Sequence, residues 1–233
     1  MSEWLPIVLI PGLLASARLY APQLPQLWRC GAVTVADHTR DDTLAGIAQR
    51  ILATAPPRFA LVGLSMGGYL SFEILRQARE RVARLALLDT SARPDTPEQS
   101  AGRRTQMQLA AHGRLAEVEQ VQFTRAVHAE HRADEALHEI SRRMAEEVGA
   151  EAFVRQQQAI MGRPDSRPLL SDIRCPTLVL VGDGDELTPP QLAAEIAAGI
   201  RDARLLTVPR SGHLSTLEQP EAVSAALLGW LRG

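Results

Sequence analysis

The chain has 233 residues, of which 45% are hydrophobic and 22% charged, a composition typical of one folded domain with an ordinary core. Its formal net charge of −2 gives no electrostatic reason to expect binding to nucleic acid or to an anionic membrane. All 25 basic residues are arginines, which excludes a lysine nucleophile or a lysine Schiff base.

Short apolar runs alternate with amphipathic segments in the first part of the chain. Apolar runs of strand length predict strands at 7–10, 33–36, 59–64 and 84–88. The segments at 21–28 and 43–55 have the apolar spacing of helices. Strands that alternate with helices in this way predict a parallel sheet with helices on both faces.

The alternation then breaks, and only helical patterns follow for a long stretch. Thr96 and Gln99 predict a capping box at the start of the first of these helices. Gly113 and Gly149 stand where helices commonly end. We interpret residues 93–165 as an inserted helical cap of three or four helices.

The strand pattern resumes after the cap. Apolar runs predict two further strands, at 176–181 and 205–208. Thr188 and Gln191 predict a second capping box, at the start of another helix. The sequence therefore predicts an α/β fold with a mostly parallel, doubly wound sheet of about six strands. Residues 1–92 and 166–233 form this core, and the helical cap is inserted between them.

The stretch Gly63-Leu64-Ser65-Met66-Gly67 ends a buried strand and opens a helix. At such a junction the serine is forced into a strained turn that lifts its hydroxyl above the sheet. Strand and helix pass so close there that a side chain at position 63 or 67 would clash. The Met66 amide lies at the positive end of the helix, where an oxyanion would be stabilised. Because a plain strand–helix turn can carry the same residues, the prediction also needs an acid and a histidine nearby.

Such groups follow neighbouring strands of the predicted sheet. In doubly wound sheets, functional side chains gather at the carboxyl ends of the strands. Ser65 follows the third strand, Asp185 the fifth and His213 the sixth. Asp89, which ends the fourth strand, and Asp183 are the alternative acids. We favour Asp185 because it stands clear of its strand, on a loop that can reach the His213 loop.

The chain resembles the α/β-hydrolase superfamily over essentially its full length. The matching segments are Pro11-Gly12-Leu13-Leu14, the stretch around Ser65, Gly182-Asp183-Gly184-Asp185 with Pro189, and Gly212-His213. This resemblance implies a catalytic triad of Ser65, His213 and Asp185, and an oxyanion hole made by the backbone amides of Leu13 and Met66. Two features depart from the family pattern. Pro-Gly stands where many members have His-Gly, and the two N-terminal antiparallel strands common in the family are missing.

The resulting expectation is a serine hydrolase that cleaves a small, mostly apolar carboxylic ester, or a thioester, through an acyl-enzyme on Ser65 that water releases. The same triad could serve C–C bond hydrolysis, a lyase step or perhydrolysis. A catalytically silent binding protein of the same fold is a further alternative. This chemistry needs no metal or cofactor. We interpret four cap histidines as side chains on a solvated face: His112, His128, His131 and His138.

The remaining sequence signals concern the compartment. Cys30 and Cys175 do not suggest a disulfide framework, and we expect buried or half-buried thiols. No apolar run approaches about 18 residues, so no membrane span is expected. The N-terminal stretch lacks the pattern of a signal peptide. We therefore expect a cytoplasmic protein, and the oligomeric state stays open.

Overall fold

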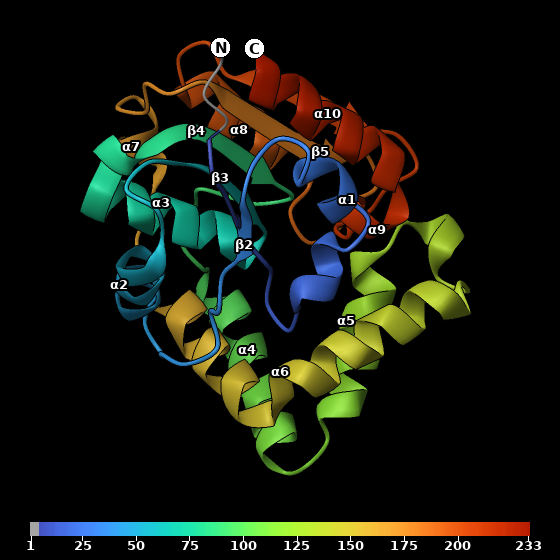
Figure 1. The fold of residues 1–233 in the computed structure, drawn as a ribbon. Coiled ribbons are helices and arrows are strands. Elements are labelled where there is room, and N and C mark those ends of the chain that lie inside the picture. The colour runs from blue at the N-terminus through green and yellow to red at the C-terminus, as the bar shows by residue number, and fades with distance from the viewer. Residues whose placement is uncertain (1–4) are drawn as a thin grey trace.

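Six parallel strands form one sheet in the computed structural model, which describes residues 5–233 (Figure 1). The strands are β1 (Ile7–Ile10), β2 (Val33–Val35), β3 (Phe59–Leu64), β4 (Val82–Leu88), β5 (Thr177–Gly182) and β6 (Arg204–Val208). They pair in the order β2-β1-β3-β4-β5-β6. The predicted parallel α/β sheet is thereby confirmed. The order reverses between β1 and β3, and ligands bind at such a switch point in open α/β sheets.

Helices cover both faces of the sheet. On one face lie α2 (Leu44–Thr54), α3 (Met66–Ala78), α7 (Arg167–Leu170) and α8 (Pro190–Gly199), whose apolar side chains share one core cluster. The other face packs against η1 (Ala17–Tyr20), α1 (Leu24–Leu27) and α10 (Pro220–Arg232). Two short helices, η2 (Arg79–Arg81) and α9 (Ser215–Glu218), lie in connections. All six residues of β3 are buried, because a parallel strand is covered on both sides.

The helix predicted at 21–28 is shorter in the structure. The chain forms a 3₁₀ turn that ends at Tyr20, and α1 begins only at Leu24. Pro22 and Pro25 flank this start. Proline lacks the amide hydrogen of the helix interior and is tolerated only in the first turn, which limits the helix here.

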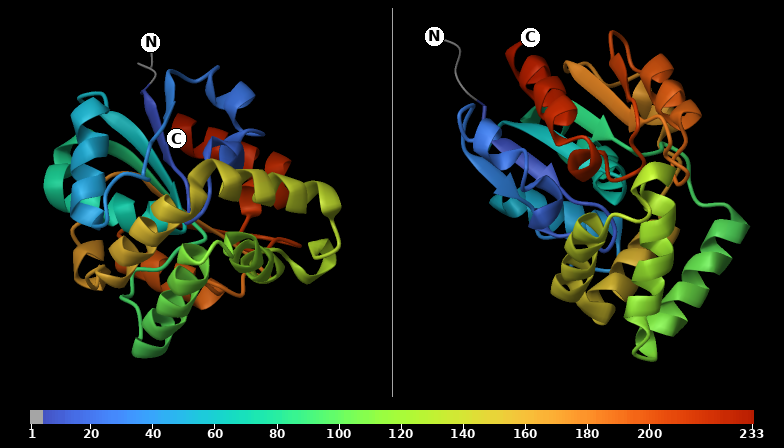
Figure 2. Two further views of the ribbon diagram at one scale, coloured as in Figure 1. Left: turned by 90° about the horizontal axis from the view of Figure 1, so that it is seen from below. Right: turned by 90° about the vertical axis from the view of Figure 1, so that its right-hand side faces the viewer.

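A group of helices connects β4 to β5. They are α4 (Pro97–Ala111), α5 (Leu115–Ala126), η3 (Ala129–His131) and α6 (Glu135–Met161). The two views of Figure 2 show them standing together on one side of the sheet. Buried side chains such as Val118 and Phe153 give them a small core of their own. Gly113 follows α4 with φ 78°, and α6 is broken at Gly149 with φ 75° and ψ 165°. Both glycines therefore end regular helix, as predicted.

The two predicted capping boxes have different outcomes. The Thr96 hydroxyl accepts from the Gln99 amide, and the Gln99 side chain accepts from the Thr96 amide, so the first is confirmed. The second is wrong, because α8 follows Pro189 without any side-chain cap. The hydroxyl of Thr188 donates instead to the carboxylate of Asp185, 2.7 Å away. The two residues that follow Thr188 are prolines, which have no amide hydrogen for a cap to accept.

Other sequence expectations concern the termini and the cysteines. Residues 1–4 lie outside the described residues. The predicted core and the segment tested for a signal peptide both begin there. Within residues 5–233, no helix has the length and hydropathy needed to cross a membrane. Cys30 is buried and Cys175 half-buried, and both are free thiols.

Candidate active site

Ser65 occupies a strained turn between β3 and α3. Its backbone has φ 56° and ψ −114°, in the left-handed half of φ space that non-glycine residues rarely adopt. The Ser65 amide donates to the Leu88 carbonyl at 2.9 Å, and its own carbonyl accepts from the Thr90 hydroxyl at 2.8 Å. These bonds to β4 and the residues after it hold the strained turn.

Two glycines make this turn sterically possible. A Cβ at Gly63 would lie 2.2 Å from the Gly67 carbonyl oxygen, and a Cβ at Gly67 would lie 2.1 Å from the Ile10 carbonyl oxygen. Both contacts are with backbone, so no side-chain movement could relieve them. The predicted reason for glycine at positions 63 and 67 is confirmed. A Cβ at a third glycine, Gly68, would lie 2.3 Å from the Thr90 hydroxyl oxygen.

His213 and Asp185 meet on neighbouring loops after β6 and β5. Nδ1 of His213 lies 2.8 Å from Oδ2 of Asp185, and both side chains are buried. The other carboxylate oxygen, Oδ1, accepts from the amides of Leu187 and Thr188. Together with the Thr188 hydroxyl, these bonds fix the carboxylate toward the imidazole. Thr188 was missed as a site residue because its sequence context resembles a helix cap.

The ion pair shifts both pKa values. Burial raises the pKa of Asp185, but the His213 charge and hydrogen bonds from His213 and Thr188 outweigh burial, so the pKa lies below its usual value. Burial lowers the pKa of His213, but the Asp185 charge and hydrogen bond outweigh it, so this pKa lies above its usual value. The charged pair is therefore favoured over two neutral groups.

The two alternative acids have other partners. Asp89 is fully buried, accepts from the Gly182 amide at 2.9 Å and accepts from the Ser215 hydroxyl. Burial and the neighbouring Asp185 charge raise its pKa well above the usual value. Asp183 accepts from the Ser211 amide at 3.2 Å. Of the three aspartates, only Asp185 is bonded to His213.

The His213 loop is also held by a buried carboxylate that sequence reasoning missed. Glu218 accepts through Oε1 from the amides of Gly212 and Leu214, on either side of His213. Its Oε2 accepts from the His128 amide at 2.7 Å and from Nδ1 of His131 at 2.8 Å. Glu218 thus joins the His213 loop to the turn between α5 and α6.

This turn also corrects the interpretation of the cap histidines. His112 is exposed as expected, but His131 bonds Glu218, and His138 is buried, bonds Glu119 at 3.2 Å and stacks on Phe123. The apolar helix spacing alone did not reveal these partners. Within residues 5–233, no three His, Cys, Asp or Glu side chains are grouped so that they could hold a metal ion.

The loop after β1 brings a second backbone amide toward Ser65. A Cβ at Gly12 would lie 3.2 Å from the Ser65 Cβ, so this loop passes directly over the serine. In the part of the chain that the structure describes, the amides of Leu13 and Met66 donate to no protein acceptor. The loop itself is fixed by Gln156, whose Oε1 accepts from the Leu14 amide. The buried His38 ring donates through Nε2 to the Gly12 carbonyl at 2.9 Å.

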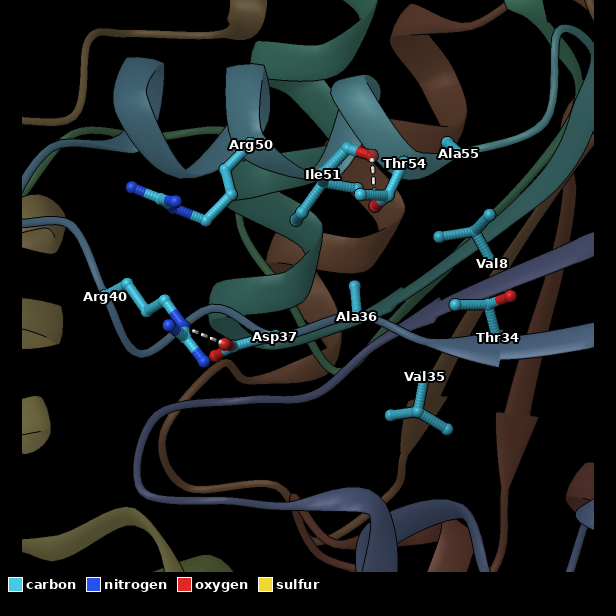
Figure 3. Close-up of a pocket in the computed structure, with 10 residues that line it drawn as sticks. All are labelled: Val8, Thr34, Val35, Ala36, Asp37, Arg40, Arg50, Ile51, Thr54 and Ala55. Carbon is cyan, nitrogen blue, oxygen red and sulfur yellow. Dashed lines mark hydrogen bonds and ion pairs between the residues drawn. The ribbon is translucent and has the colours of Figure 1, made fainter.

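Ser65 and His213 line one cavity of about 590 Å³, within the range of small-molecule sites. The wall near Ser65 is mainly apolar, with Leu13, Leu14 and Leu64, whereas α4, α5 and α6 contribute more polar side chains. A smaller cavity of about 350 Å³ lies between β2 and α2 (Figure 3). Its two arginines are exposed and paired with Asp37 and Asp41, and it contains no predicted site residue.

A parallel sheet with a serine at this turn and a histidine in the same cavity is typical of hydrolases of the α/β class. The sequence matches the model of the Alpha/beta hydrolase family over residues 1–226, and the chain belongs to this family.

Several relatives match over almost the whole chain. A thermophilic esterase from Thermogutta terrifontis, solved with malate bound, superposes with a TM-score of 0.88 at 30% identity, covering 98% of this chain and 89% of that one. A pimeloyl-[acyl-carrier protein] methyl ester esterase of Aromatoleum aromaticum is 27% identical over 97% of this chain and 92% of its own length. A proposed carbamate hydrolase of Variovorax paradoxus is 28% identical over 97% and 91%. The chain is therefore an enzyme of the hydrolase class.

Proposed function

We propose that the chain cleaves small carboxylic esters, or thioesters, through an acyl-enzyme on Ser65. The observation that carries this proposal is the 2.8 Å contact between Nδ1 of His213 and Asp185, in a histidine that shares its cavity with Ser65. With Nδ1 bound to the carboxylate, Nε2 is the nitrogen left to act as a base.

In the proposed reaction, Ser65 Oγ attacks the acyl carbon while Nε2 of His213 takes the hydroxyl proton. Asp185 holds the ring in the required tautomer and stabilises the imidazolium that forms. The imidazolium then gives its proton to the leaving alkoxide or thiolate. Water attacks the acyl-enzyme with His213 again as base, which releases the acid and restores the serine.

The amides of Leu13 and Met66 are the proposed oxyanion hole. Met66 directly follows Ser65, and Leu13 follows Gly12, which packs against Ser65. Neither amide has an acceptor among residues 5–233. Donors of this kind contribute roughly 3–4 kcal/mol each to transition-state stabilisation in comparable sites. Gln156 and His38 support this role, because they hold the loop that carries the Leu13 amide.

The proposed substrate is small, with a mainly apolar part next to Ser65. The apolar wall around the serine supports this, and so do the relatives that are named esterases. We further propose that residues 93–165 act as a cap that sets substrate choice, because α4, α5 and α6 supply the opposite wall of the cavity. The two reactants are therefore this small acyl compound and water.

A fluorophosphonate probe tests the mechanism directly. We expect one covalent adduct, located on Ser65 by peptide mass spectrometry, and none in Ser65→Ala. Labelling of Ser16 or Ser211 instead would refute the assignment, and no labelling of a folded protein would favour a silent binding protein. A panel of p-nitrophenyl esters with acyl chains of increasing length would then define the substrate size.

A further inference from the structure

Two guanidinium groups share one carboxylate beside the Ser65 cavity. Arg103 binds Asp95 through Nε at 2.7 Å, and Nη1 of Arg163 binds the same carboxylate. The side chain of Arg163 is 5% exposed and that of Asp95 is 2% exposed. Within the described chain, no second carboxylate lies at ion-pair distance from either arginine. The cluster therefore carries one positive charge in excess, which is unfavourable in a nearly buried place.

The hydrogen bonds of Arg163 leave one nitrogen for a ligand. Nε donates to the Arg93 carbonyl at 2.9 Å, and Nη1 donates to Asp95 and to the Ile160 carbonyl. Nη2 donates to no residue between 5 and 233, although Arg163 lines the cavity. An arginine donor left without a partner at a cavity wall fits an acceptor from outside the chain.

A glutamine on the same cavity, Gln106, also has a side-chain donor without an acceptor. The Oε1 atom of Gln106 accepts from Gln122 and from Gln157, and Gln157 in turn accepts from Arg103. The oxygen of Gln106 is therefore used, while its Nε2 has no acceptor among the described residues. Gln106 also lines the cavity. Arg163 and Gln106 thus both offer donors on the cavity wall.

This wall lies close to the serine along α3. The guanidinium carbon of Arg163 lies 4.3 Å from the centroid of the Tyr69 ring, and Tyr69 lines the same cavity. The Tyr69 amide donates to the Ser65 carbonyl at 3.4 Å, so Tyr69 lies in the first turn of α3 directly after the serine. A molecule held at Ser65 can extend over Tyr69 to Arg163.

Two other charged groups on the cavity wall, Glu119 and Arg93, have partners of their own. Glu119 bonds His138 and Ser141, so its carboxylate is already satisfied. Arg93 forms a two-bond ion pair with Glu195. Glu98 and Arg125, two exposed side chains of opposite charge, also line the cavity and form no ion pair among residues 5–233. Among the cavity groups that are not exposed, the uncompensated positive charge is therefore that of the cluster formed by Arg103, Arg163 and Asp95.

We propose that Arg163 and Arg103 form an anion subsite, and that the ester substrate carries a carboxylate a few carbons from the ester bond. The substrate class is then a monoester of a dicarboxylic acid. This inference rests on the proposed ester hydrolysis at Ser65. One excess charge matches a carboxylate monoanion better than a phosphate dianion.

The kinetic test compares monomethyl esters of succinate through suberate with methyl alkanoates of equal acyl length, following acid release at constant pH. The wild type should prefer the acidic ester at the best length by at least tenfold in kcat/KM. Arg163→Gln and Arg103→Gln should each remove most of this preference, through a higher KM for the acidic ester. Arg93→Gln is the matched control, because its charge is already paired with Glu195, and it should keep the preference.

A binding test separates the subsite from the chemistry. Glutarate should raise the melting temperature of Ser65→Ala, and this shift should vanish when Arg163→Gln is added. Equal kcat/KM for acidic and neutral esters in the wild type would overturn the subsite while leaving the ester hydrolysis in place. Absence of any ester cleavage would refute the proposed function, and a glutarate shift dependent on Arg163 would still support the subsite. A larger shift with inorganic phosphate than with glutarate would overturn the carboxylate assignment.

Discussion

Asp185 and His213 lie 2.8 Å apart, and the pair is buried at the meeting point of two loops that follow neighbouring strands. The carboxylate accepts two backbone amides and one hydroxyl besides the imidazole. Asp89 lies near the same pair but is bonded to Ser215 and to the Gly182 amide. This difference in partners separates the carboxylate that is bonded to His213 from a buried carboxyl that does not touch it.

Replacing each of the three aspartates by asparagine should show which carboxylate the reaction needs. Asp185→Asn keeps the shape but favours the wrong imidazole tautomer, which costs roughly 10⁴-fold in kcat in serine-protease triads. We expect a loss of several orders of magnitude for Asp185→Asn and much smaller losses for Asp89→Asn and Asp183→Asn. The measurement is kcat on a p-nitrophenyl ester, with circular dichroism to check folding. An inactive, folded Asp89→Asn beside a nearly wild-type Asp185→Asn would move the acid to the loop after β4.

The pH dependence follows from the raised pKa of His213. Only the neutral ring can accept the serine proton, so kcat/KM should rise with pH through a midpoint above 6.5, the ordinary value for histidine. In Asp185→Asn the residual activity should show a lower midpoint, because the charge that raises the pKa is gone. A midpoint at or below 6.5 in the wild type, or no downward shift in the variant, would contradict this assignment.

The same shift has a consequence for stability. Because the pKa of His213 is higher in the folded than in the unfolded chain, its protonation favours folding. This contribution is fully present below the unfolded pKa and disappears as pH rises through the folded pKa. Asp185 acts in the opposite sense, since its lowered pKa contributes stability above the unfolded value that is lost as pH falls through the folded one. The pair should therefore stabilise the fold most between the unfolded pKa values of the two groups.

Glu218 should matter for both stability and activity. In Glu218→Gln the amide nitrogen must face one set of donors, either the amides beside His213 or those of the α5–α6 turn. A buried donor left without an acceptor costs about 1–3 kcal/mol. We expect a loss of this size in urea denaturation, a lower kcat, and a downward shift of the His213 pKa, which the Glu218 charge helps to raise. Glu221→Gln, on the exposed side of α10, is the control and should change none of the three.

The local parts of this site could be predicted from the sequence, and the long-range supports could not. Strand ends, the elbow around Ser65 and the histidine after β6 are visible as patterns within a few residues. The bond between the Leu14 amide and Gln156 joins residues 142 positions apart, and the bond between Glu218 and His128 joins residues 90 positions apart. No short pattern encodes such pairs. Thr188 shows that a short pattern can also mislead, because a helix does begin just after it, but its hydroxyl donates to Asp185, three residues earlier, and caps no helix amide.

The final prediction concerns the role of residues 93–165 in choosing the acyl chain. Met144 and Phe153 are both apolar side chains of α6, and the structure places them in different surroundings. Met144 lines the Ser65 cavity, whereas Phe153 is fully buried in a small cluster that α4, α5 and α6 share with Leu14. Only Met144 is therefore expected to touch a bound acyl chain.

Met144→Ala should enlarge the cavity and favour longer chains. Each additional methylene that the new space buries is worth about 0.8 kcal/mol, or roughly fourfold in kcat/KM. The ratio of kcat/KM for longer to shorter p-nitrophenyl esters should rise by about this factor per carbon until the space is filled. Met107→Ala is the matched control, because Met107 lies on α4 but not among the residues that line the cavity. If Met107→Ala changed the ratio as much as Met144→Ala, the effect would come from loosening of the cap and not from contact with the acyl chain. If Met144→Ala removed all activity from a folded protein, the cap would hold a group needed for the reaction itself.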